Sequence, residues 1–266
     1  MSGELPPPKK RLGQHFLIDP NIVRKIVIAA EITPDETVLE IGPGRGALTE
    51  ELAATAGRVV AVELDPALYR FLQARQHERS NVELIHADAL TYPLERLPVG
   101  TVVVANLPYY ISTPLLFTLL EQRARFPRMV LMLQEEVADR LAANPGSDDY
   151  GVLSVMAQYA AEVDKLFRVS AQCFRPRPEV ASAVVSLRSK LSTDLSSQEE
   201  RTFAGLVKGS FAHRRKMMLN SLRDEGYDQR TVTEAMSRLG LSAQVRAESL
   251  SPEQFVGLTR LLHSRF

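Results

Sequence analysis

Five short apolar runs in the first half of the chain have the length and residue types of buried β-strands. Segments whose apolar residues recur at helical spacing separate most of these runs. The predicted strands are residues 37–41, 59–63, 82–85, 102–105 and 129–133. Because strands that alternate with helices are typical of a doubly wound sheet, the pattern predicts an α/β, Rossmann-like domain with a mostly parallel sheet.

The pattern predicts further elements on both sides of these strands. A helix is expected to begin after Asp19, which can cap it, with Pro20 at its first position. After the fifth strand, helices are expected at 135–143 and 152–159 and strands at 163–169 and 183–187. We expect these last two strands to join one edge of the sheet as a hairpin-like addition.

The rest of the chain has helical patterning with turns, and it follows a polar linker at 189–197. Gly226, Gly240 and the pair Ser251-Pro252 mark the expected turns. The sequence therefore predicts two domains. Residues 1–190 would form the Rossmann-like domain, with 1–11 as a flexible basic tail, and residues 198–266 a small all-helical C-terminal domain.

Composition narrows the classes of protein. The chain has 266 residues, 45% of them hydrophobic, which is enough to bury a full core. Its single cysteine, Cys173, excludes an internal disulfide and a four-cysteine metal site. No metal is expected. No run approaches the roughly 18 apolar residues that a membrane span needs. We expect a cytoplasmic protein that does not contact membranes.

The net charge of zero argues against a surface coated in nucleic acid, yet basic residues gather locally. The groups are Lys9, Lys10 and Arg11; Arg168, Arg175 and Arg177; and Arg201, Lys208, Arg214, Arg215 and Lys216. Each group can be a solvated face or a phosphate contact, and composition alone leaves both interpretations open.

A glycine-rich turn follows the first predicted strand at residues 42–47, where a helix then begins. Glycines there let a cofactor lie against the backbone, and the spacing also satisfies a dinucleotide fingerprint. Glu40 just before this turn would repel a pyrophosphate, whereas the sulfonium and amino groups of S-adenosylmethionine are cations. The turn therefore favours S-adenosylmethionine over a nicotinamide cofactor.

Polar residues stand at three successive strand ends: Glu63, Asp88 and Asn106. Since ligands bind across the carboxyl ends of parallel strands, these side chains should converge on one crevice. Glu63 is expected to accept from both ribose hydroxyls and Asp88 from the adenine amino group of the cofactor. A helix cap for Asp88 and a turn acid for Glu63 are the structural alternatives.

Asn106-Leu107-Pro108-Tyr109 follows a buried strand, and a buried amide is costly unless it is used. Methylation of an adenine amino group would use the Asn106 amide to bind that amino group. The Asn106 oxygen and a nearby backbone carbonyl would accept the two amine hydrogens and free the nitrogen lone pair. Tyr109 would stack on the extruded base, and Pro108 would stiffen that wall.

Four ordered motifs together resemble the bacterial small-subunit (16S) ribosomal RNA adenine N6,N6-dimethyltransferase family. They are Leu12-Gly-Gln-His-Phe-Leu17, Val38-Leu-Glu-Ile-Gly-Pro-Gly-Arg-Gly46, Asn106-Leu-Pro-Tyr109 and Phe174-Arg-Pro-Arg-Pro-Glu-Val180. The resemblance covers essentially the whole chain. It implies dimethylation of two adjacent adenosines in a hairpin near the 3′ end of 16S rRNA during maturation of the 30S subunit. S-adenosylmethionine is the implied cofactor, the immature 30S subunit the partner, and a monomer the expected state.

The resemblance also assigns roles to individual residues. The implied cofactor-binding residues are His15, Leu17, Gly42, Gly44, Glu63, Leu64, Asp88, Ala89 and Asn106. The implied catalytic residues are Asn106, Leu107, Pro108, Tyr109 and Phe174, and the implied RNA-binding residues are Arg175, Arg177, Arg214, Arg215 and Lys216. Phe174 would form the stacking face opposite Tyr109, although a core aromatic is its alternative. The family most often has Asn where His15 stands, so the mode of contact of His15 is open.

Three other functions compete with this hypothesis. A related family methylates an adenine of 23S rRNA, although the C-terminal pattern here resembles the small-subunit enzymes more. A nicotinamide dehydrogenase would explain the glycine turn but gives no use for Asn106-Leu-Pro-Tyr109. A third possibility is that binding of the 30S particle as an assembly checkpoint matters more than catalysis.

Overall fold

The computed structural model describes residues 5–9, 12–76, 79–190, 195–213 and 216–263. The chain forms two compact units, each containing two segments of the sequence. Unit 1 consists of Met1–Ala138 and Ala161–Leu191, and unit 2 of Asp139–Ala160 and Ser192–Phe266.

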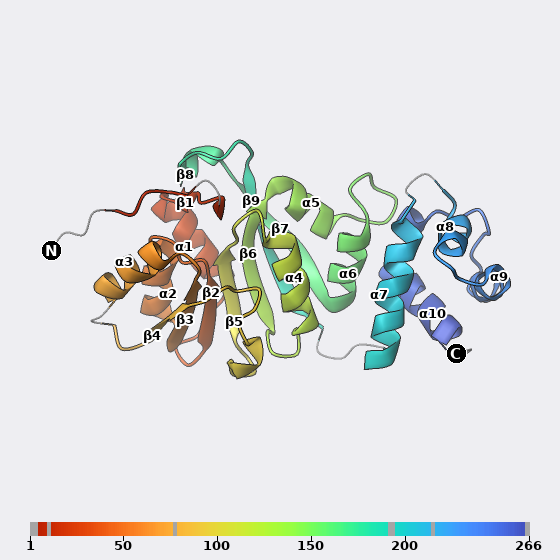
Figure 1. Ribbon diagram of the computed structural model, residues 1–266, viewed down its shortest axis with the longest axis horizontal. Helices are drawn as coiled ribbons and strands as arrows, with labels where there is room; N and C mark the ends of the chain where they lie inside the picture. The colour runs from red at the N-terminus through yellow and green to blue at the C-terminus, as the bar shows by residue number, and fades with distance from the viewer. Residues whose placement is uncertain (1–4, 10–11, 77–78, 191–194, 214–215, 264–266) are drawn as a thin grey trace. The chain divides into compact units, whose positions relative to one another are not determined.

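Unit 1 contains, among its described residues, a seven-stranded sheet with the strand order β4-β3-β2-β5-β6-β9-β7 (Figure 1). The strands are β2 (Thr37–Ile41), β3 (Arg58–Glu63), β4 (Val82–His86), β5 (Val102–Asn106), β6 (Arg128–Gln134), β7 (Ala161–Val169) and β9 (Ser182–Ser189). The first five are parallel, and β9 pairs antiparallel with both β6 and β7. The predicted fold class and the antiparallel addition at the sheet edge are confirmed.

The order of the strands fixes where a ligand can bind. From β2 the chain proceeds outward to β3 and β4, then returns to place β5 on the other side of β2. Val38 therefore pairs with Val102, and Glu40 with Val104. Because the connections after β2 and β5 leave in opposite directions, a crevice opens between the carboxyl ends of these two strands.

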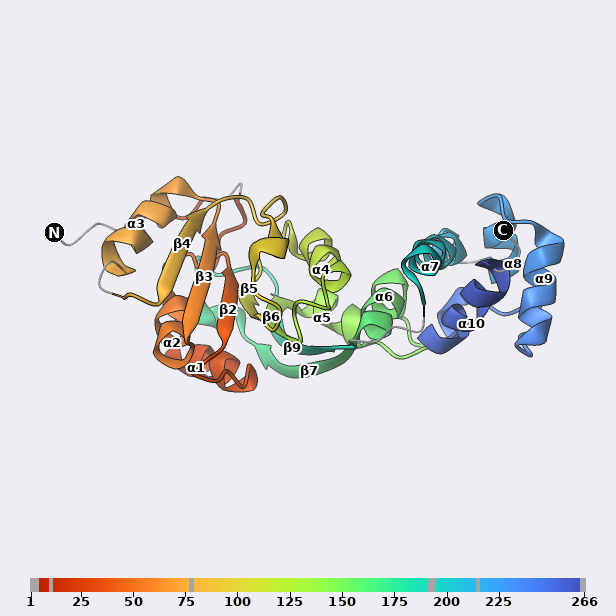
Figure 2. The same cartoon turned by 90° about the horizontal axis from the view of Figure 1, so that it is seen from below.

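Helices cover both faces of this sheet (Figure 2). The helices of unit 1 include α1 (Pro20–Ala29), α2 (Ala47–Thr55), α3 (Pro66–Gln76) and α4 (Ser112–Glu121), and α5 (Glu135–Ala142) begins in it. α1 and α2 lie on one face, where they bury a core with alternate residues of the strands, and α4 lies on the other. Asp19 caps α1 by accepting from the N–H of Asn21 at 2.9 Å, as the sequence predicted.

A short antiparallel sheet was not predicted: β1 (Phe16–Leu17) pairs with β8 (Phe174–Arg175). The segment before β1 is anchored as well. Arg45 donates to the carbonyl of Pro6 at 2.8 Å, and the Lys9 ammonium lies 2.6 Å from a carboxylate oxygen of Asp65. The expected flexible tail at 1–11 is thus wrong for residues 5–9, because pattern alone does not show such long-range partners. Residues 1–4 and 10–11 lie outside the described residues.

Unit 2 is helical, as predicted for the C-terminal part. Its main helices are α6 (Val152–Ala160), α7 (Ser197–Phe211), α8 (Met218–Asp224), α9 (Gln229–Arg238) and α10 (Pro252–His263). The predicted boundary, with 1–190 in one domain and 198–266 in the other, missed that residues 139–160 pack with this unit. The Tyr150 hydroxyl donates to the Leu250 carbonyl at 2.8 Å, and the rings of Tyr159 and Phe203 lie 4.3 Å apart. Within the described part of the chain, no helix is long and apolar enough to cross a membrane.

Candidate active site

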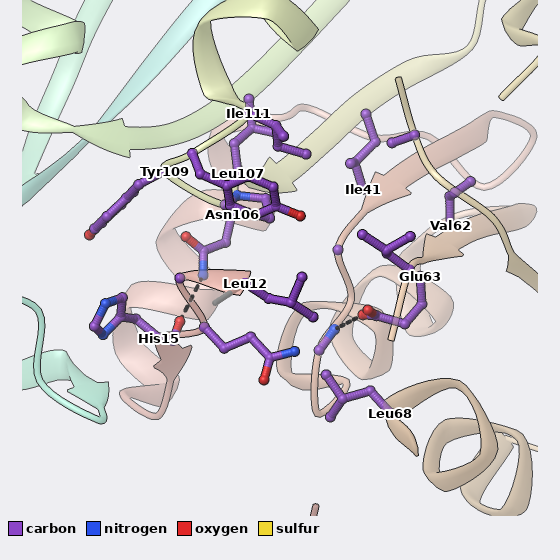
Figure 3. A pocket seen from close by; sticks show the side chains of 18 of the residues that line it. Leu12, His15, Ile41, Val62, Glu63, Leu68, Asn106, Leu107, Tyr109 and Ile111 are labelled. Carbon is purple, nitrogen blue, oxygen red and sulfur yellow. Dashed lines mark hydrogen bonds between the residues drawn. The ribbon is translucent and has the colours of Figure 1, made fainter. Parts of the chain in front are cut away.

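A cavity opens at the carboxyl ends of the parallel strands, where the reversal of strand order predicts it (Figure 3). The space between the atoms there is about 730 Å³, which includes space open to solvent. Segment 12–16 and the residues that follow β2, β3, β4 and β5 line it. The predicted cofactor residues that line it are His15, Gly42, Gly44, Glu63, Leu64, Asp88, Ala89 and Asn106. Leu17 does not.

Gly42 and Gly44 form the turn after β2 with left-handed backbone angles, φ 68° and 60°. A side chain is strained in that region of backbone space. A β-carbon on Gly44 would also lie 3.1 Å from the Phe16 ring, tighter than ordinary contact. The glycines therefore serve the turn and the close approach of segment 12–16, as well as leaving room for a cofactor.

Glu63 ends β3 and is held from two sides. One carboxylate oxygen accepts from the N–H of Gly44 at 3.0 Å and the other from the N–H of Asp65 at 2.8 Å. Burial raises the pKa of Glu63, and these two N–H groups act against the rise. Since each carboxylate oxygen can accept more than one hydrogen bond, the group remains able to bind a ribose.

Glu40 does not face the cavity, although the sequence suggested that it would lie beside a cationic cofactor. Successive strand residues point to opposite faces, and Glu40 lies among the buried residues rather than in the cavity lining, 1% exposed. Burial raises the pKa of Glu40 to about 8, with a smaller contribution from the charge of Glu63. The side chain is therefore mostly neutral at pH 7, so the expectation that an anion before the turn faces a cationic cofactor is wrong.

Asp88, at the cavity edge after β4, bonds to the residues that follow it. Its Oδ1 accepts from the N–H of Leu90 at 2.9 Å, which stabilises the turn after the strand. Asp88 therefore both stabilises the turn after β4 and lines the cavity, so the two interpretations of this residue are compatible.

Asn106 and Tyr109 lie together on one side of the cavity (Figure 3). The Asn106 amide nitrogen donates to the carbonyl of His15 at 3.4 Å. The Tyr109 hydroxyl lies 2.8 Å from the hydroxyl of Ser182, at the start of β9. Burial raises the pKa of the Tyr109 phenol, and the hydrogen bond to Ser182 lowers it. Ser182 was not predicted, because nothing local in the sequence signals its contact with a residue 73 positions away.

Phe174 and Leu17 are corrections to the predicted site. The two residues pair with each other in the β1–β8 sheet, and both belong to the core between the main sheet and α1. Phe174 is 0% exposed and Leu17 is 6% exposed. A ring without exposed surface cannot stack on a base in this conformation, so the alternative of a core aromatic describes Phe174.

Residues 5–9 and 12–17 are here called the N-terminal strap; residues 12–16 line the cavity, and the strap is bonded to an acid that the sequence did not indicate. Asp65, two residues after Glu63, accepts from the Lys9 ammonium at 2.6 Å and from the Gln14 amide at 3.0 Å. Burial raises the pKa of Asp65, but the hydrogen bonds from Lys9, Ala67 and Gln14 outweigh it, so the pKa is lowered overall. Asp65 is therefore a buried anion that fastens the strap beside Glu63.

The predicted RNA-binding residues fall in both units. Arg175 and Arg177 are exposed in unit 1, and Arg175 also donates to the carbonyl of Phe174 at 2.9 Å. Lys216 is exposed in unit 2 and donates to Asp224 at 2.7 Å. Arg214 and Arg215 lie outside the described residues.

The residues of the cavity fit S-adenosylmethionine. Gly42 and Gly44 leave bare backbone at one wall, Glu63 presents oriented oxygens at the next strand, and Asp88 stands beyond it. Asn106 lies on the opposite side from Glu63, where a group that receives a methyl would have to approach (Figure 3).

Comparison with known proteins finds similarity along nearly the whole chain. A family model described as "Ribosomal RNA adenine dimethylase" matches residues 8–264. A protein of Moorella thermoacetica named "Ribosomal RNA small subunit methyltransferase A" is 44% identical over 96% of this chain and 92% of its own length. A protein of the same name from Geobacter metallireducens is 41% identical over 98% of both chains.

Solved structures with a similar fold include two RNA-modifying enzymes. A dimethyladenosine transferase from Plasmodium falciparum has a TM-score of 0.80 at 29% identity, over 92% of this chain and 96% of that one. The 23S rRNA methyltransferase ErmE has a TM-score of 0.74, also at 29% identity, over 93% of this chain and 99% of that one.

Proposed function

Because the chain belongs to the ribosomal RNA adenine dimethylase family and is an S-adenosylmethionine-dependent methyltransferase of small-subunit rRNA adenines, we propose that the cavity around Asn106 is where the methyl group is transferred. The observation that carries the proposal is the position of Asn106 and Tyr109 across the cavity from Glu63 and the glycine turn.

The cofactor half of the site consists of Glu63, Asp88 and the glycine turn. Bound S-adenosylmethionine supplies a methyl group activated by a sulfonium. Glu63, already oriented by Gly44 and Asp65, accepts from the ribose hydroxyls, and Asp88 accepts from the cofactor's adenine amine. Residues 12–16 of the N-terminal strap line the cavity, and Lys9 bonds the strap to Asp65.

The acceptor half makes the adenine amine nucleophilic. Its lone pair is delocalised into the ring until its hydrogens are accepted by the protein. Asn106 accepts one hydrogen through Oδ1, and a nearby backbone carbonyl accepts the other. Holding the amine in line with the methyl group supplies most of the rate through proximity and orientation.

The base must leave its stack to reach these groups, and Tyr109 provides a face to hold it. Stacking on an aromatic ring grips a base without reading its neighbours. Choice of the RNA therefore rests on contacts away from the cavity. We assign phosphate contacts to Arg175 and Arg177 beside the acceptor half and to Arg214, Arg215 and Lys216 in the helical unit.

The substrate we propose is a hairpin near the 3′ end of 16S rRNA in the immature 30S subunit, dimethylated at two adjacent adenosines. The enzyme would act as a monomer in the cytoplasm, where subunits assemble. The small-subunit names of its relatives support this choice over 23S rRNA, although ErmE has a similar fold.

The test is methylation of three substrates under the same conditions: immature 30S particles, mature 30S particles and protein-free 23S rRNA. We expect labelled methyl groups in the immature 30S particles alone. Labelling of 23S rRNA would contradict the proposed substrate. Specific binding of immature 30S particles by a Glu63→Ala variant that cannot methylate them would add a checkpoint role to the catalytic one.

A further inference from the structure

Two buried serines hold Tyr109, one at its backbone and one at the far end of its ring. The Ser112 hydroxyl, at the start of α4, donates to the Tyr109 carbonyl at 3.1 Å. The Ser182 hydroxyl, at the start of β9, lies 2.8 Å from the Tyr109 phenol oxygen. Ser112 is 2% exposed and Ser182 is 0% exposed, and all three residues belong to unit 1. Both ends of the tyrosine are therefore restrained.

The register of the sheet explains how Tyr109 reaches β9. Asn106, at the end of β5, pairs with Met132 in β6, and Met132 pairs with Val184 in β9. Because β9 runs antiparallel to β6, the first residue of β9 lies at the edge of the sheet where β5 and β6 end. Tyr109 follows Asn106 by three residues, so its side chain extends past the end of β6 to meet β9 at this edge.

Ser182 is held in place because strands on both sides bond its backbone. It pairs with Gln134 in β6 and with Val169 in β7. The N–H of Glu135 also donates to the carbonyl of the preceding residue, Ala181, at 3.0 Å. A short side chain on such a backbone has few positions for its hydroxyl. The serine can therefore define where the phenol of its partner lies.

The hydrogen bond between Tyr109 and Ser182 is separate from stacking. Stacking on a base uses the faces of an aromatic ring, and phenylalanine offers the same faces without a hydroxyl. Figure 3 shows the Tyr109 side chain extending away from Glu63, with the hydroxyl at its far end. Tyr109 lines the cavity and Ser182 does not. The serine can therefore influence a bound base only through the tyrosine.

We propose that Ser182 is a positioning residue for methyl transfer, whose hydroxyl fixes the plane of the Tyr109 ring so that the stacked base presents its amine to Asn106. This inference rests on the proposed function. The ring turns about two bonds, and Ser112 restrains the backbone from which they start. A hydrogen bond at the far end of the ring restrains both rotations. Loss of that bond misaligns the base but still lets it bind, so the effect falls on kcat.

The experiment removes the hydrogen bond from each partner in turn. Methylation of immature 30S particles is measured for the wild type, Ser182→Ala, Tyr109→Phe and the double variant, together with cofactor affinity by calorimetry. Each single change should lower kcat about three- to tenfold, with KM for the particle within about twofold of wild type. The double variant should be no slower than the slower single variant, because both changes break the same bond. Cofactor affinity should stay within about twofold of wild type in every variant.

Ser189→Ala is the matched control. Ser189 lies at the other end of β9, where its hydroxyl donates to the Phe126 carbonyl at 2.6 Å. This change removes a side-chain hydrogen bond from the same strand, away from the cavity, and should leave kcat unchanged. Thermal unfolding of every variant distinguishes a loss of folded protein from a loss of kcat. Tyr109→Phe breaks the bond without altering β9, so the test does not depend on the folding of Ser182→Ala.

Three results would overturn the inference. Wild-type kcat in Ser182→Ala would show that the hydrogen bond does not position the ring. Losses that multiply in the double variant would show that Ser182 acts independently of the Tyr109 hydroxyl, as a purely structural residue would. Wild-type kcat with about a tenfold rise in KM or loss of cofactor affinity would assign Ser182 to binding. Absence of methylation by the wild type would instead contradict the proposed function itself.

Discussion

The backbone N–H of Gly44 donates to a carboxylate oxygen of Glu63 at 3.0 Å, which ties the glycine turn after β2 to the acid that ends β3. The two features that the sequence suggested as separate cofactor contacts are thus one unit. A substitution of Glu63 would therefore disturb the glycine turn, and the N–H of Gly44 orients the Glu63 carboxylate.

Glu63→Gln should weaken binding of S-adenosylmethionine by about ten- to a hundredfold, because hydrogen bonds from the ribose lose their charged acceptor. Isothermal titration measures the effect. Glu83→Gln is the matched control, since Glu83 forms an exposed ion pair with Arg58, and such pairs contribute little. Equal affinity of Glu63→Gln and wild type would remove Glu63 from the cofactor site.

Glu40 should make stability depend on pH. The pKa of about 8 in the folded protein lies above the value of about 4.5 expected when unfolded, so the folded state holds the proton more tightly. The resulting stabilisation is complete below pH 4.5 and is lost as pH rises through 8. Without cofactor, this group should cost the wild type about 3 kcal/mol of unfolding free energy between pH 6 and 9. Glu40→Gln should lose much less. The unfolding free energy is measured by denaturant titration at each pH. The same pH dependence in the wild type and in Glu40→Gln would contradict a buried, neutral Glu40.

Lys9 should slow release of the cofactor by holding the N-terminal strap on Asp65. A partly buried ion pair of this kind is worth about 1 kcal/mol, so Lys9→Ala should release S-adenosylmethionine about fivefold faster in stopped-flow experiments. Salt should accelerate release from the wild type more than from the variant. Arg230→Ala, which breaks an exposed pair with Glu234 in the helical unit, serves as control. An unchanged release rate in Lys9→Ala would show that the strap does not gate the cavity.

Phe174→Leu distinguishes a core residue from a stacking wall. As a core residue, Phe174 should cost about 1–2 kcal/mol of stability when shortened, with KM for the RNA substrate within about twofold of wild type. Phe126→Leu replaces another fully buried phenylalanine and should destabilise the protein similarly. Normal stability combined with a tenfold rise in KM would restore the stacking role that the resemblance implied.

The sequence predicted the sheet because its signal is local. Each parallel strand is a run of apolar residues, and the glycine turn, Glu63 and Asn106 follow strands whose carboxyl ends must meet. These residues were placed correctly at the cavity without any knowledge of tertiary contacts.

The errors concern contacts between distant parts of the chain. Phe174 has the motif of a stacking residue, but its pairing with Leu17 turns the ring into the core. Glu40 stands next to the turn in sequence, yet alternation along β2 directs it away from the cavity. The Lys9–Asp65 pair and the Tyr109–Ser182 bond join residues 56 and 73 positions apart, and no periodic pattern records them.

The central claim is that Asn106 makes an rRNA adenine amine nucleophilic. It is tested by incubating immature 30S particles with isotopically labelled S-adenosylmethionine and analysing the nucleosides of 16S rRNA by mass spectrometry. The wild type should give two labelled dimethyladenosines per particle. Asn106→Ala should slow methyl transfer at least a hundredfold, about 3 kcal/mol, while still binding the cofactor. Near-normal formation of dimethyladenosine by Asn106→Ala would contradict the account.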